Sequence, residues 1–185
     1  MEIKDKDGKV ILVVKDRDDK GSLTEGERVR SKGVDLEFAN LHRADLKNAN
    51  LEYGRLDSVD LSEADLEDAK LGMANAGSAN FSRATLRNAD LYGSFLNMAN
   101  FEEANLEGAN LQGANLIEAN LRGANLTNAN LSPDNMAVET ALHSADLSGA
   151  KVDAANFDQA IYDELTIFPA GFNPQDHNMK VEPSS

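Results

Sequence analysis

Three histidines and an excess of carboxylates are the side chains of this chain that could carry out chemistry. The histidines are His42, His143 and His177, and they are accompanied by 32 Asp and Glu residues. A metal site or a general acid–base pair needs such groups close to one another. The sequence contains no phosphate-binding loop, no dinucleotide-binding pattern and no cysteine nucleophile. Any chemistry therefore depends on whether the fold brings the histidines and carboxylates together.

A short acidic stretch near the N-terminus, Asp5-Lys6-Asp7-Gly8, resembles the beginning of a calcium-binding loop. Such a loop needs oxygen ligands at alternate positions and a bidentate carboxylate at its end. Here Lys9 offers no oxygen ligand, and the twelfth place holds Asp16. We therefore interpret Asp7-Gly8 as the turn of a β-hairpin and not as a metal site.

Composition narrows the class of protein. The 185 residues suffice for one domain and include no cysteine, which excludes disulfides and thiolate metal sites. The net charge of −14 argues against direct binding to nucleic acids or anionic membranes. No apolar run approaches the ~20 residues that span a bilayer, and the first residues lack the apolar core of a signal peptide. We expect a cytoplasmic protein.

The dominant feature is a five-residue repeat, Ala-(Asp/Asn)-Leu-x-x, which begins at Val34. Clear examples are Ala44-Asp45-Leu46 and Ala109-Asn110-Leu111. We call the Leu or Phe position the centre of each repeat. Centres recur every five residues from Leu36 to Leu131, resume after a one-residue slip near 132–137, and make 24 repeats in all. We interpret the slip as a surface bulge of one extra residue.

A period of five fits neither a helix nor a continuous strand. On an α-helix each step of five turns by ~500°, which spreads the leucines around the whole circumference. On a strand an odd step sends successive leucines to opposite faces. Within one repeat, however, Ala and Leu are two residues apart and can both point inward from a short extended piece. The chain is therefore predicted to coil around a narrow axis lined by Leu and Ala.

The repeated Ala-(Asp/Asn)-Leu-x-x motif resembles the pentapeptide-repeat family. The resemblance covers about residues 33–162 and implies an all-β fold, a right-handed quadrilateral parallel β-helix with four repeats per 20-residue coil. The chain supports this period, because four of the five breaks in the Ala position, at residues 34, 54, 94 and 134, are separated by multiples of 20. About six coils would make a rod roughly 29 Å long. Phe81 and Phe101, one coil apart, are expected to stack.

In such a rod the chemical groups are kept apart. His42 and His143 would lie about five coils, or ~24 Å, from each other. The carboxylates of the Asp/Asn position would lie on the outer wall of a filled solenoid, which offers no cleft. We therefore predict no catalytic, cofactor-binding or metal-ligating residue, and we expect that the chain is not an enzyme.

The segments on either side of the repeats are expected to cover the ends of the rod. Residues 1–31 predict an N-terminal cap, with strands at Met1–Asp5 and Lys9–Lys15 and a short helix at Leu23–Arg30 that begins with a capping-box pattern. The repeat domain takes residues 32–162. Residues 163–185 predict a plug rich in large apolar residues, followed by a disordered tail from Asn173. This C-terminal segment resembles those of many cyanobacterial family members.

The outward positions predict regular polar columns. Alternating charges one coil apart should form ion-pair ladders that fix register: Arg43, Glu63, Arg83 and Glu103 in one column, and Lys47, Glu67, Arg87 and Glu107 in another. Asn occupies every position before a centre from Asn100 to Asn135, and stacked Asn amides could hydrogen-bond along the rod.

One side of the predicted rod departs from this polar pattern. Its outward candidates for a partner-contact face are Phe38, Arg55, Phe95, Met98 and Ile117. A neighbouring column adds Tyr53, Met73 and Tyr92. Clustered exposed apolar residues mark contact surfaces. The alternative is that these residues pack locally, with Phe95 against Phe38 or Tyr92, or lie singly in solvent.

The function favoured by these features is a non-catalytic protein–protein interaction or scaffold protein, whose protein partner the sequence does not identify. We expect a monomer or a weak homodimer. The alternative, suggested by the family resemblance, is an acidic DNA mimic that binds a type II topoisomerase such as gyrase. From Asn88 onward the chain contains three basic and 14 acidic residues, and this negative charge supports the alternative. Family members of that type are typically dimers joined through C-terminal helices, and the quinolone-resistance members often carry added loops. Neither feature is evident in the sequence.

Overall fold

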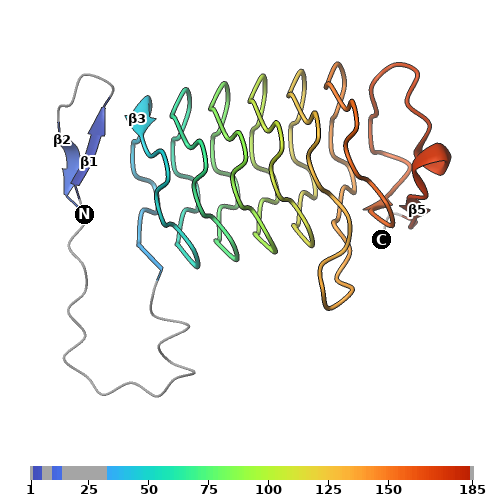
Figure 1. The fold of residues 1–185 in the computed structure, drawn as a ribbon, viewed down its shortest axis with the longest axis horizontal. Coiled ribbons are helices and arrows are strands. Elements are labelled where there is room, and N and C mark those ends of the chain that lie inside the picture. The colour runs from blue at the N-terminus through green and yellow to red at the C-terminus, as the bar shows by residue number, and fades with distance from the viewer. Residues whose placement is uncertain (1, 6–9, 14–32, 184–185) are drawn as a thin grey trace.

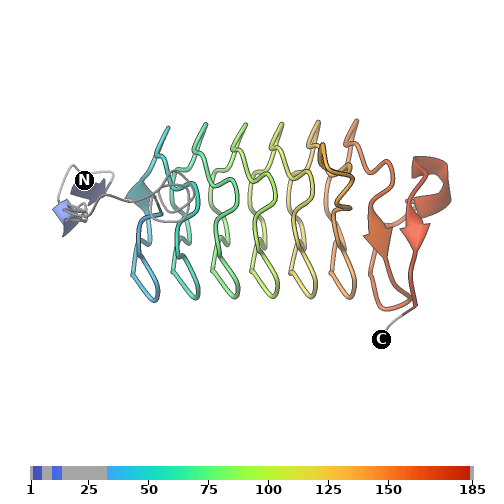
Figure 2. The same cartoon turned by 90° about the horizontal axis from the view of Figure 1, so that it is seen from below.

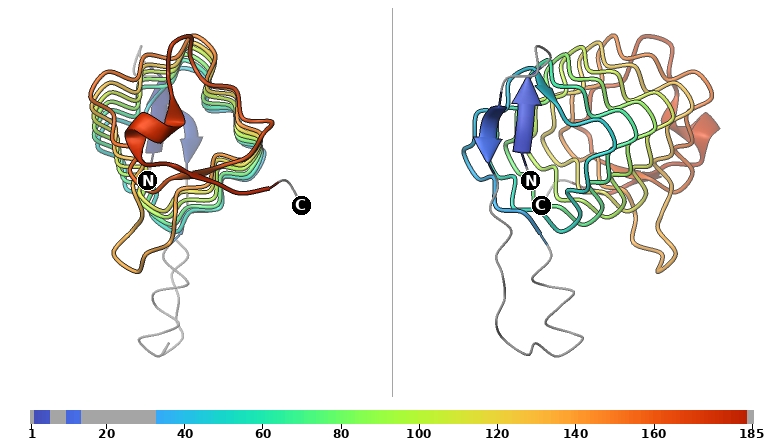
Figure 3. Two further views of the ribbon diagram at one scale, coloured as in Figure 1. Left: turned by 90° about the vertical axis from the view of Figure 1, so that its right-hand side faces the viewer. Right: turned by 60° about the vertical axis from the view of Figure 1, so that its left-hand side comes forward.

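Parallel bridges 20 residues apart stack the chain into a rod, as Figure 1 shows. The computed structural model describes residues 2–5, 10–13 and 33–183. Each outward residue before a centre pairs with its counterpart one coil later, as in the series Asp65, Thr85, Asn105 and Asn125. Viewed along its axis, the rod has four sides (Figure 3). The predicted right-handed quadrilateral β-helix is confirmed.

The four sides are named here by their bridge residues. The first side carries residues 35, 55, 75, 95 and 115, and the fourth side carries residues 50, 70, 90, 110 and 130. The fourth corner, which joins the fourth side to the first, contains residue pairs 52–53, 72–73, 92–93 and 112–113. The coils stack evenly along the rod in the view from below as well (Figure 2).

The corners explain how five residues can form one side. At nearly every corner the second residue after the centre has a positive φ, for example 58° at Arg43 and 56° at Asn88. A backbone bond then closes the turn, such as that from Ala44 N to Leu41 O at 2.9 Å. Only one residue per corner has the left-handed backbone conformation with positive φ. Most corners therefore accept a residue other than glycine.

Leucine and alanine fill the axis, as the repeat predicts. Leu66, Leu86, Leu106 and Leu126 are fully buried in one column. The rings of Phe81 and Phe101 stack with centroids 4.8 Å apart and planes inclined by 2°, so that prediction is confirmed. Apolar side chains that repeat every coil thus bury one continuous core along the rod.

The outer columns carry the expected hydrogen bonds. Asn120 Nδ2 donates to Asn100 Oδ1 at 3.0 Å, and Asn125 Nδ2 donates to Asn105 Oδ1 at 3.1 Å. The same Asn oxygens accept from backbone N–H groups two residues later, as from Arg122 N to Asn120 Oδ1 at 3.1 Å. These side chains therefore link neighbouring coils and shape the corner at the same time.

The charge ladders form as short groups. Arg43 pairs with Glu63 at 2.7 Å, and Arg83 pairs with Glu103 at 2.8 Å. In the next column both Lys47 and Arg87 pair with Glu67. The salt bridges of the described residues do not extend this column to Glu107. Because the pairs are exposed, each contributes only about 0–1 kcal/mol to stability.

At the N-terminal end, β1 (Glu2–Asp5) pairs antiparallel with β2 (Val10–Val13) and with β3 (Ala44–Asp45). The two expected strands are present, and β1 lies along the edge of the first coil. The predicted turn at Asp7-Gly8 and the predicted helix at Leu23–Arg30 lie outside the described residues.

At the C-terminal end, the expectation of a disordered tail from Asn173 is wrong for residues 173–183. There β4 (Ile161–Tyr162) pairs in parallel with β5 (Lys180–Val181), and the 3-10 helix η1 (Pro174–His177) lies between them in the chain. The Asn173 side chain caps η1 by accepting from Gln175 N. Phe172 stacks on His177 and meets Phe157 edge-on, so the tail is held against the last coil.

The slip near 132–137 is an inserted loop and not a one-residue bulge. Bridges before it join residues 20 apart, whereas Asn115 pairs with Ala141, Asn120 with Asp146 and Asn130 with Asn156, which are 26 apart. The coil is therefore longer by six residues. The additional residues project from the fourth corner of the rod and form the orange loop in Figure 1.

Candidate protein-interaction surface

The five candidate contact residues occupy the first side and its corner, and most are open to solvent. Phe38 is 76% exposed, Phe95 is 51% exposed and Met98 is 57% exposed. Arg55 is also exposed, and Ile117 is half-buried. Phe95 stands in the bridge column between Asn75 and Asn115, at a place where repetition supplies asparagine.

The structure divides these candidates into two groups. Phe95 and Met98 lie in the same coil, and Met98 N donates to Ile117 O of the next coil at 2.8 Å. Phe38 is three coils away from Phe95, about 14 Å by the strand spacing. Arg55 pairs with Asp35 and with Glu37, both in the first coil, so its guanidinium points away from Phe95.

Phe95 does not stack on either of the two aromatic rings considered as its local packing partners. Among the described aromatic rings, the pairs in contact do not include Phe95 with Phe38 or with Tyr92. Phe95, Met98 and Ile117 thus lie at outward positions of two neighbouring coils.

The inserted segment, residues 132–140, is termed here the Asp134 loop, and the Asp134 carboxylate organises it. Asp134 Oδ1 accepts from Met136 N and from Val138 N, each at 2.8 Å. The other oxygen, Oδ2, accepts from the Tyr92 hydroxyl at 3.2 Å. Backbone hydrogen bonds from Val138 and Met136, opposed by burial, hold the pKa of the Asp134 carboxyl below its ordinary value.

Both ends of the loop are fastened to the rod. The Thr140 hydroxyl is buried, accepts from Gly113 N at 3.0 Å and lies 3.0 Å from Leu111 O. Gln112 Nε2 donates to Pro133 O at 3.0 Å. Farther along, Lys180 Nζ pairs with Glu139 Oε1 at 3.1 Å and links the loop to β5. Contacts outside the loop's own residues therefore fasten it to the rod and to β5.

The side chains at the tip of this loop are apolar and exposed. Met136 is 69% exposed and Val138 is 49% exposed. The repeat pattern did not reveal this feature, because counting in fives places Met136 at a centre. A signal was present in Ser132-Pro133-Asp134-Asn135, whose residue types favour a turn.

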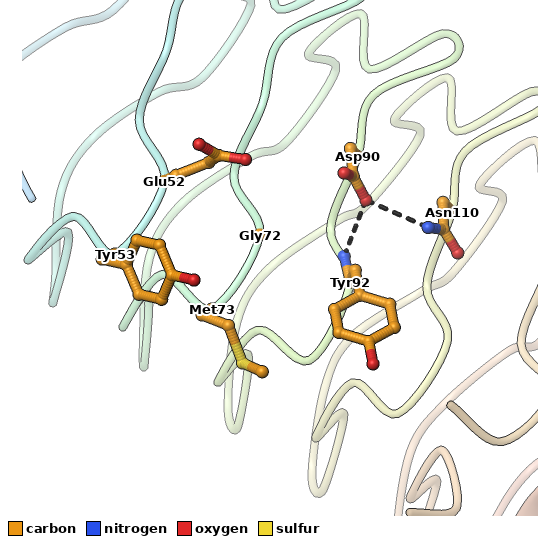
Figure 4. A pocket seen from close by; sticks show the side chains of 7 residues that line it. All are labelled: Glu52, Tyr53, Gly72, Met73, Asp90, Tyr92 and Asn110. Carbon is orange, nitrogen blue, oxygen red and sulfur yellow. Dashed lines mark hydrogen bonds between the residues drawn. The ribbon is translucent and has the colours of Figure 1, made fainter. Parts of the chain in front are cut away.

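The fourth corner also holds a hollow of about 170 Å³, shown in Figure 4. It lies between successive coils of the rod. Its lining residues are Glu52, Tyr53, Gly72, Met73, Asp90, Tyr92 and Asn110. Tyr53, Met73 and Tyr92, expected from the sequence to extend the contact face, thus line one hollow together with two carboxylates.

The histidines do not come together. His42 Nδ1 lies 2.9 Å from Ser62 Oγ, His143 Nε2 lies 3.5 Å from Glu182 Oε2, and His177 stacks on Phe172. In residues 2–5, 10–13 and 33–183, no group of three His, Asp or Glu side chains could hold a metal ion. In the same part of the chain, no helix is long and apolar enough to cross a membrane.

Comparison with known proteins agrees with this architecture. The family model for pentapeptide repeats matches residues 32–68, 60–97 and 96–132. HetL, a pentapeptide repeat protein involved in heterocyst differentiation regulation from the cyanobacterium Nostoc, is 36% identical, with a TM-score of 0.59. That match covers 81% of this chain and 66% of HetL, slightly less than two thirds.

A second solved structure, a pentapeptide repeat protein from the cyanobacterium Cyanothece, is 33% identical, with a TM-score of 0.49. It is matched over 54% of this chain and 63% of its own length. No curated protein matches the chain closely enough to count as a relative.

Proposed function

The chain belongs to the pentapeptide-repeat family, and we propose that it is a non-catalytic protein that binds a protein partner through the fourth corner and the first side of its rod. The proposed contact residues are Phe95, Met98, Ile117, Met136 and Val138. Phe38 and Arg55 stay outside this surface, because they lie at the N-terminal end. A cytoplasmic setting, expected from the sequence, is part of the proposal.

The observation that carries the proposal is the Asp134 loop. Its Met136 and Val138 side chains are exposed at the tip, yet its backbone is fixed by Asp134, Tyr92 and Thr140. Exposed apolar side chains gain free energy when a partner covers them. A loop that is already ordered loses little conformational entropy on binding, which favours affinity.

The negative charge of the chain favours a partner whose contact surface is basic. The chain carries a net charge of −14, and residues 88–185 hold three basic and 14 acidic residues. Complementary fields accelerate encounter and disfavour partners of the same sign. A partner with an apolar recess bordered by Lys or Arg would suit both the loop tip and the acidic field around it.

The test compares the wild type with the double variant Met136→Ser, Val138→Thr. Affinity capture from the organism that encodes the chain is followed by binding measurements with each purified captured protein. We expect one partner to bind the wild type and to bind the double variant at least tenfold more weakly, while the melting temperature is unchanged. The variant Glu102→Gln, at an exposed corner position outside the proposed surface, is the control and should bind like the wild type. Equal binding by all three proteins would reject this surface.

The acidic DNA mimic remains a second candidate function, because the negative charge is concentrated in residues 88–185. On that account the partner is a basic DNA channel of a type II topoisomerase, and the whole acidic wall contributes. A gyrase supercoiling assay with the purified chain distinguishes the two candidates. Inhibition by the wild type and the double variant alike would favour the mimic over a contact centred on the loop tip.

A further inference from the structure

The hollow at the fourth corner exists because one side chain is missing from a column. The residues directly after the fourth-side centres are Glu52, Gly72, Tyr92 and Gln112, so Gly72 leaves a gap between two large neighbours. The backbone does not require glycine there, since Gly72 has no positive φ. A Cβ atom at Gly72 would meet Tyr92 O at 3.7 Å, an ordinary contact. The fold would accept a side chain at this place, and the gap is a property of this sequence.

Two carboxylates border the gap. Asp90 Oδ1 accepts from Tyr92 N at 3.1 Å and from Asn110 Nδ2 at 3.0 Å. Asp90 Oδ2 would lie 4.0 Å from a Cβ at Gly72, so it faces the hollow. Glu52 lines the opposite side (Figure 4). In the described residues, the salt bridges do not include Glu52 or Asp90.

Polarizable apolar groups supply the rest of the lining. Figure 4 shows the Tyr53 ring, the Met73 thioether and the Tyr92 ring side by side along the corner. Aromatic faces attract cations, and a planar guanidinium can stack on a ring while it donates two hydrogen bonds to a carboxylate. An anion would be repelled by Glu52 and Asp90, and a purely apolar group would leave both carboxylates desolvated without a partner.

We propose that this hollow binds the guanidinium of an arginine side chain on the partner protein. The proposal rests on the proposed function, because it names one contact that the partner makes. Glu52 and Asp90 accept from the guanidinium, and Tyr53 or Tyr92 stacks on it. The Asp134 loop is coupled to this site, because the Tyr92 hydroxyl is held by Asp134 Oδ2.

The bridge column that contains Asp90 suggests a conservative variant for the test. Asn occupies the same register position at Asn50, Asn110 and Asn130, so Asp90→Asn keeps an acceptor for Tyr92 N and removes only the charge. The matched control is Asp60→Asn on another side. Asp60 Oδ1 likewise accepts from a backbone N–H two residues later, Ser62 N, and from the Asn of the next coil, Asn80. A third variant, Gly72→Gln, fills the hollow with the residue type that Gln112 provides two coils later in the same column.

The experiment titrates the full chain with N-acetyl-L-arginine methylamide, which represents an arginine within a polypeptide, and follows backbone amide shifts by NMR. We expect saturable shifts at Tyr53, Gly72 and Tyr92 with millimolar affinity, and none with the neutral citrulline analogue. Asp90→Asn should weaken binding by about tenfold or more, Gly72→Gln should abolish it, and Asp60→Asn should leave it unchanged.

The outcomes separate this inference from the proposed function. Absence of saturable shifts in the wild type, or equal binding by Asp90→Asn and Asp60→Asn, overturns the arginine site. In either case the loop-tip variant still tests the contact surface on its own. Conversely, arginine binding at the hollow with unaltered partner binding by Met136→Ser, Val138→Thr would keep the site and reject the loop as the contact.

Discussion

The Tyr92 hydroxyl donates a hydrogen bond of 3.2 Å to Asp134 Oδ2, across 42 residues of chain. Tyr92 belongs to the fourth corner of the rod, and Asp134 belongs to the inserted loop. The bond therefore fastens the loop to a coil that it does not adjoin in sequence. Burial and this hydrogen bond to Asp134 raise the pKa of the Tyr92 phenol above its ordinary value, so the hydroxyl keeps its proton near neutral pH.

Asp134 is predicted to determine whether the loop is ordered. Asp134→Ala removes the acceptor for Met136 N and Val138 N and should speed amide exchange at both residues by about tenfold or more, because both backbone N–H groups lose their hydrogen bond to the carboxylate. Tyr92→Phe removes only the tether to the rod and should have a smaller effect. Exchange in the bridge column of Asn100 and Asn120 should stay as in the wild type.

The same loop should loosen in acid. Because the pKa of Asp134 is lowered in the folded chain, its contribution is present above the ordinary carboxyl pKa and is lost as the pH falls through the folded value. Amide exchange at Val138 followed from pH 6 downward measures this loss. Uniform protection of Val138 in wild type and Asp134→Ala at every pH would contradict the role given to this carboxylate.

Much of the rod could be read from the sequence, because each repeat folds by the same local rules. Leu106 and Leu126 were predicted to be buried since Leu recurs at one place in every side, and Phe81 stacks on Phe101 since they are one coil apart. Asn100 and Asn120 form their ladder for the same reason. For a residue that follows the repeat, its position within the repeat therefore predicts whether it is buried and which residues it contacts one coil away.

The features that the sequence did not predict depend on contacts outside the repeat. Met136 falls at a counted centre, yet it lies at a loop tip because Asp134 closes a turn and the Thr140 hydroxyl accepts from Gly113 N. Residues 173–183 are ordered because His177 stacks on Phe172, a pairing that polar composition hides. The hollow arises from Gly72, whose effect depends on its neighbours one coil before and one coil after.

Gly113 should tolerate a side chain less well than Gly123, a corner glycine with the same φ. Its φ is 65°, and a Cβ there would lie 3.0 Å from Asp134 Cβ, whereas at Gly123, with the same φ of 65°, the nearest neighbour would be Glu103 Cγ at 3.7 Å. Gly123→Ala should therefore cost only the left-handed conformation, about 1 kcal/mol. Gly113→Ala should cost more and also displace the Asp134 loop.

Thermal unfolding and amide exchange together measure the difference between these two variants. For a chain of this length, about 1 kcal/mol lowers the melting temperature by roughly 2–4 °C, which is the result expected of Gly123→Ala. Gly113→Ala should melt lower and exchange faster at Val138. Equal melting temperatures with equal loop protection would show that Gly113 does not press on Asp134.

The C-terminal segment should also be sensitive to acid, because the buried Asp163 holds it. Its Oδ1 accepts from Ser144 N at 2.8 Å and from Leu165 N at 3.1 Å, and its Oδ2 accepts from Ser144 Oγ at 3.1 Å. Burial alone would raise the pKa of this carboxyl, but the hydrogen bonds, with a further one from the Thr166 hydroxyl, lower it to about 2.

The sign of the pH dependence follows from that lowered value. A carboxyl whose folded pKa lies below its unfolded pKa stabilises the fold above the unfolded value, about 4, and the stabilisation is lost as the pH falls toward 2. Asp163→Asn should lower stability by about 1–2 kcal/mol at pH 7, since the amide replaces only one acceptor. Between pH 4 and pH 2 the gap between the melting temperatures of wild type and variant should close. Asp153→Asn, at an exposed corner, controls for the loss of one charge and should follow the wild type throughout. A gap that stays constant from pH 7 to pH 2 would mean that Asp163 is not the group whose protonation releases the C-terminal segment.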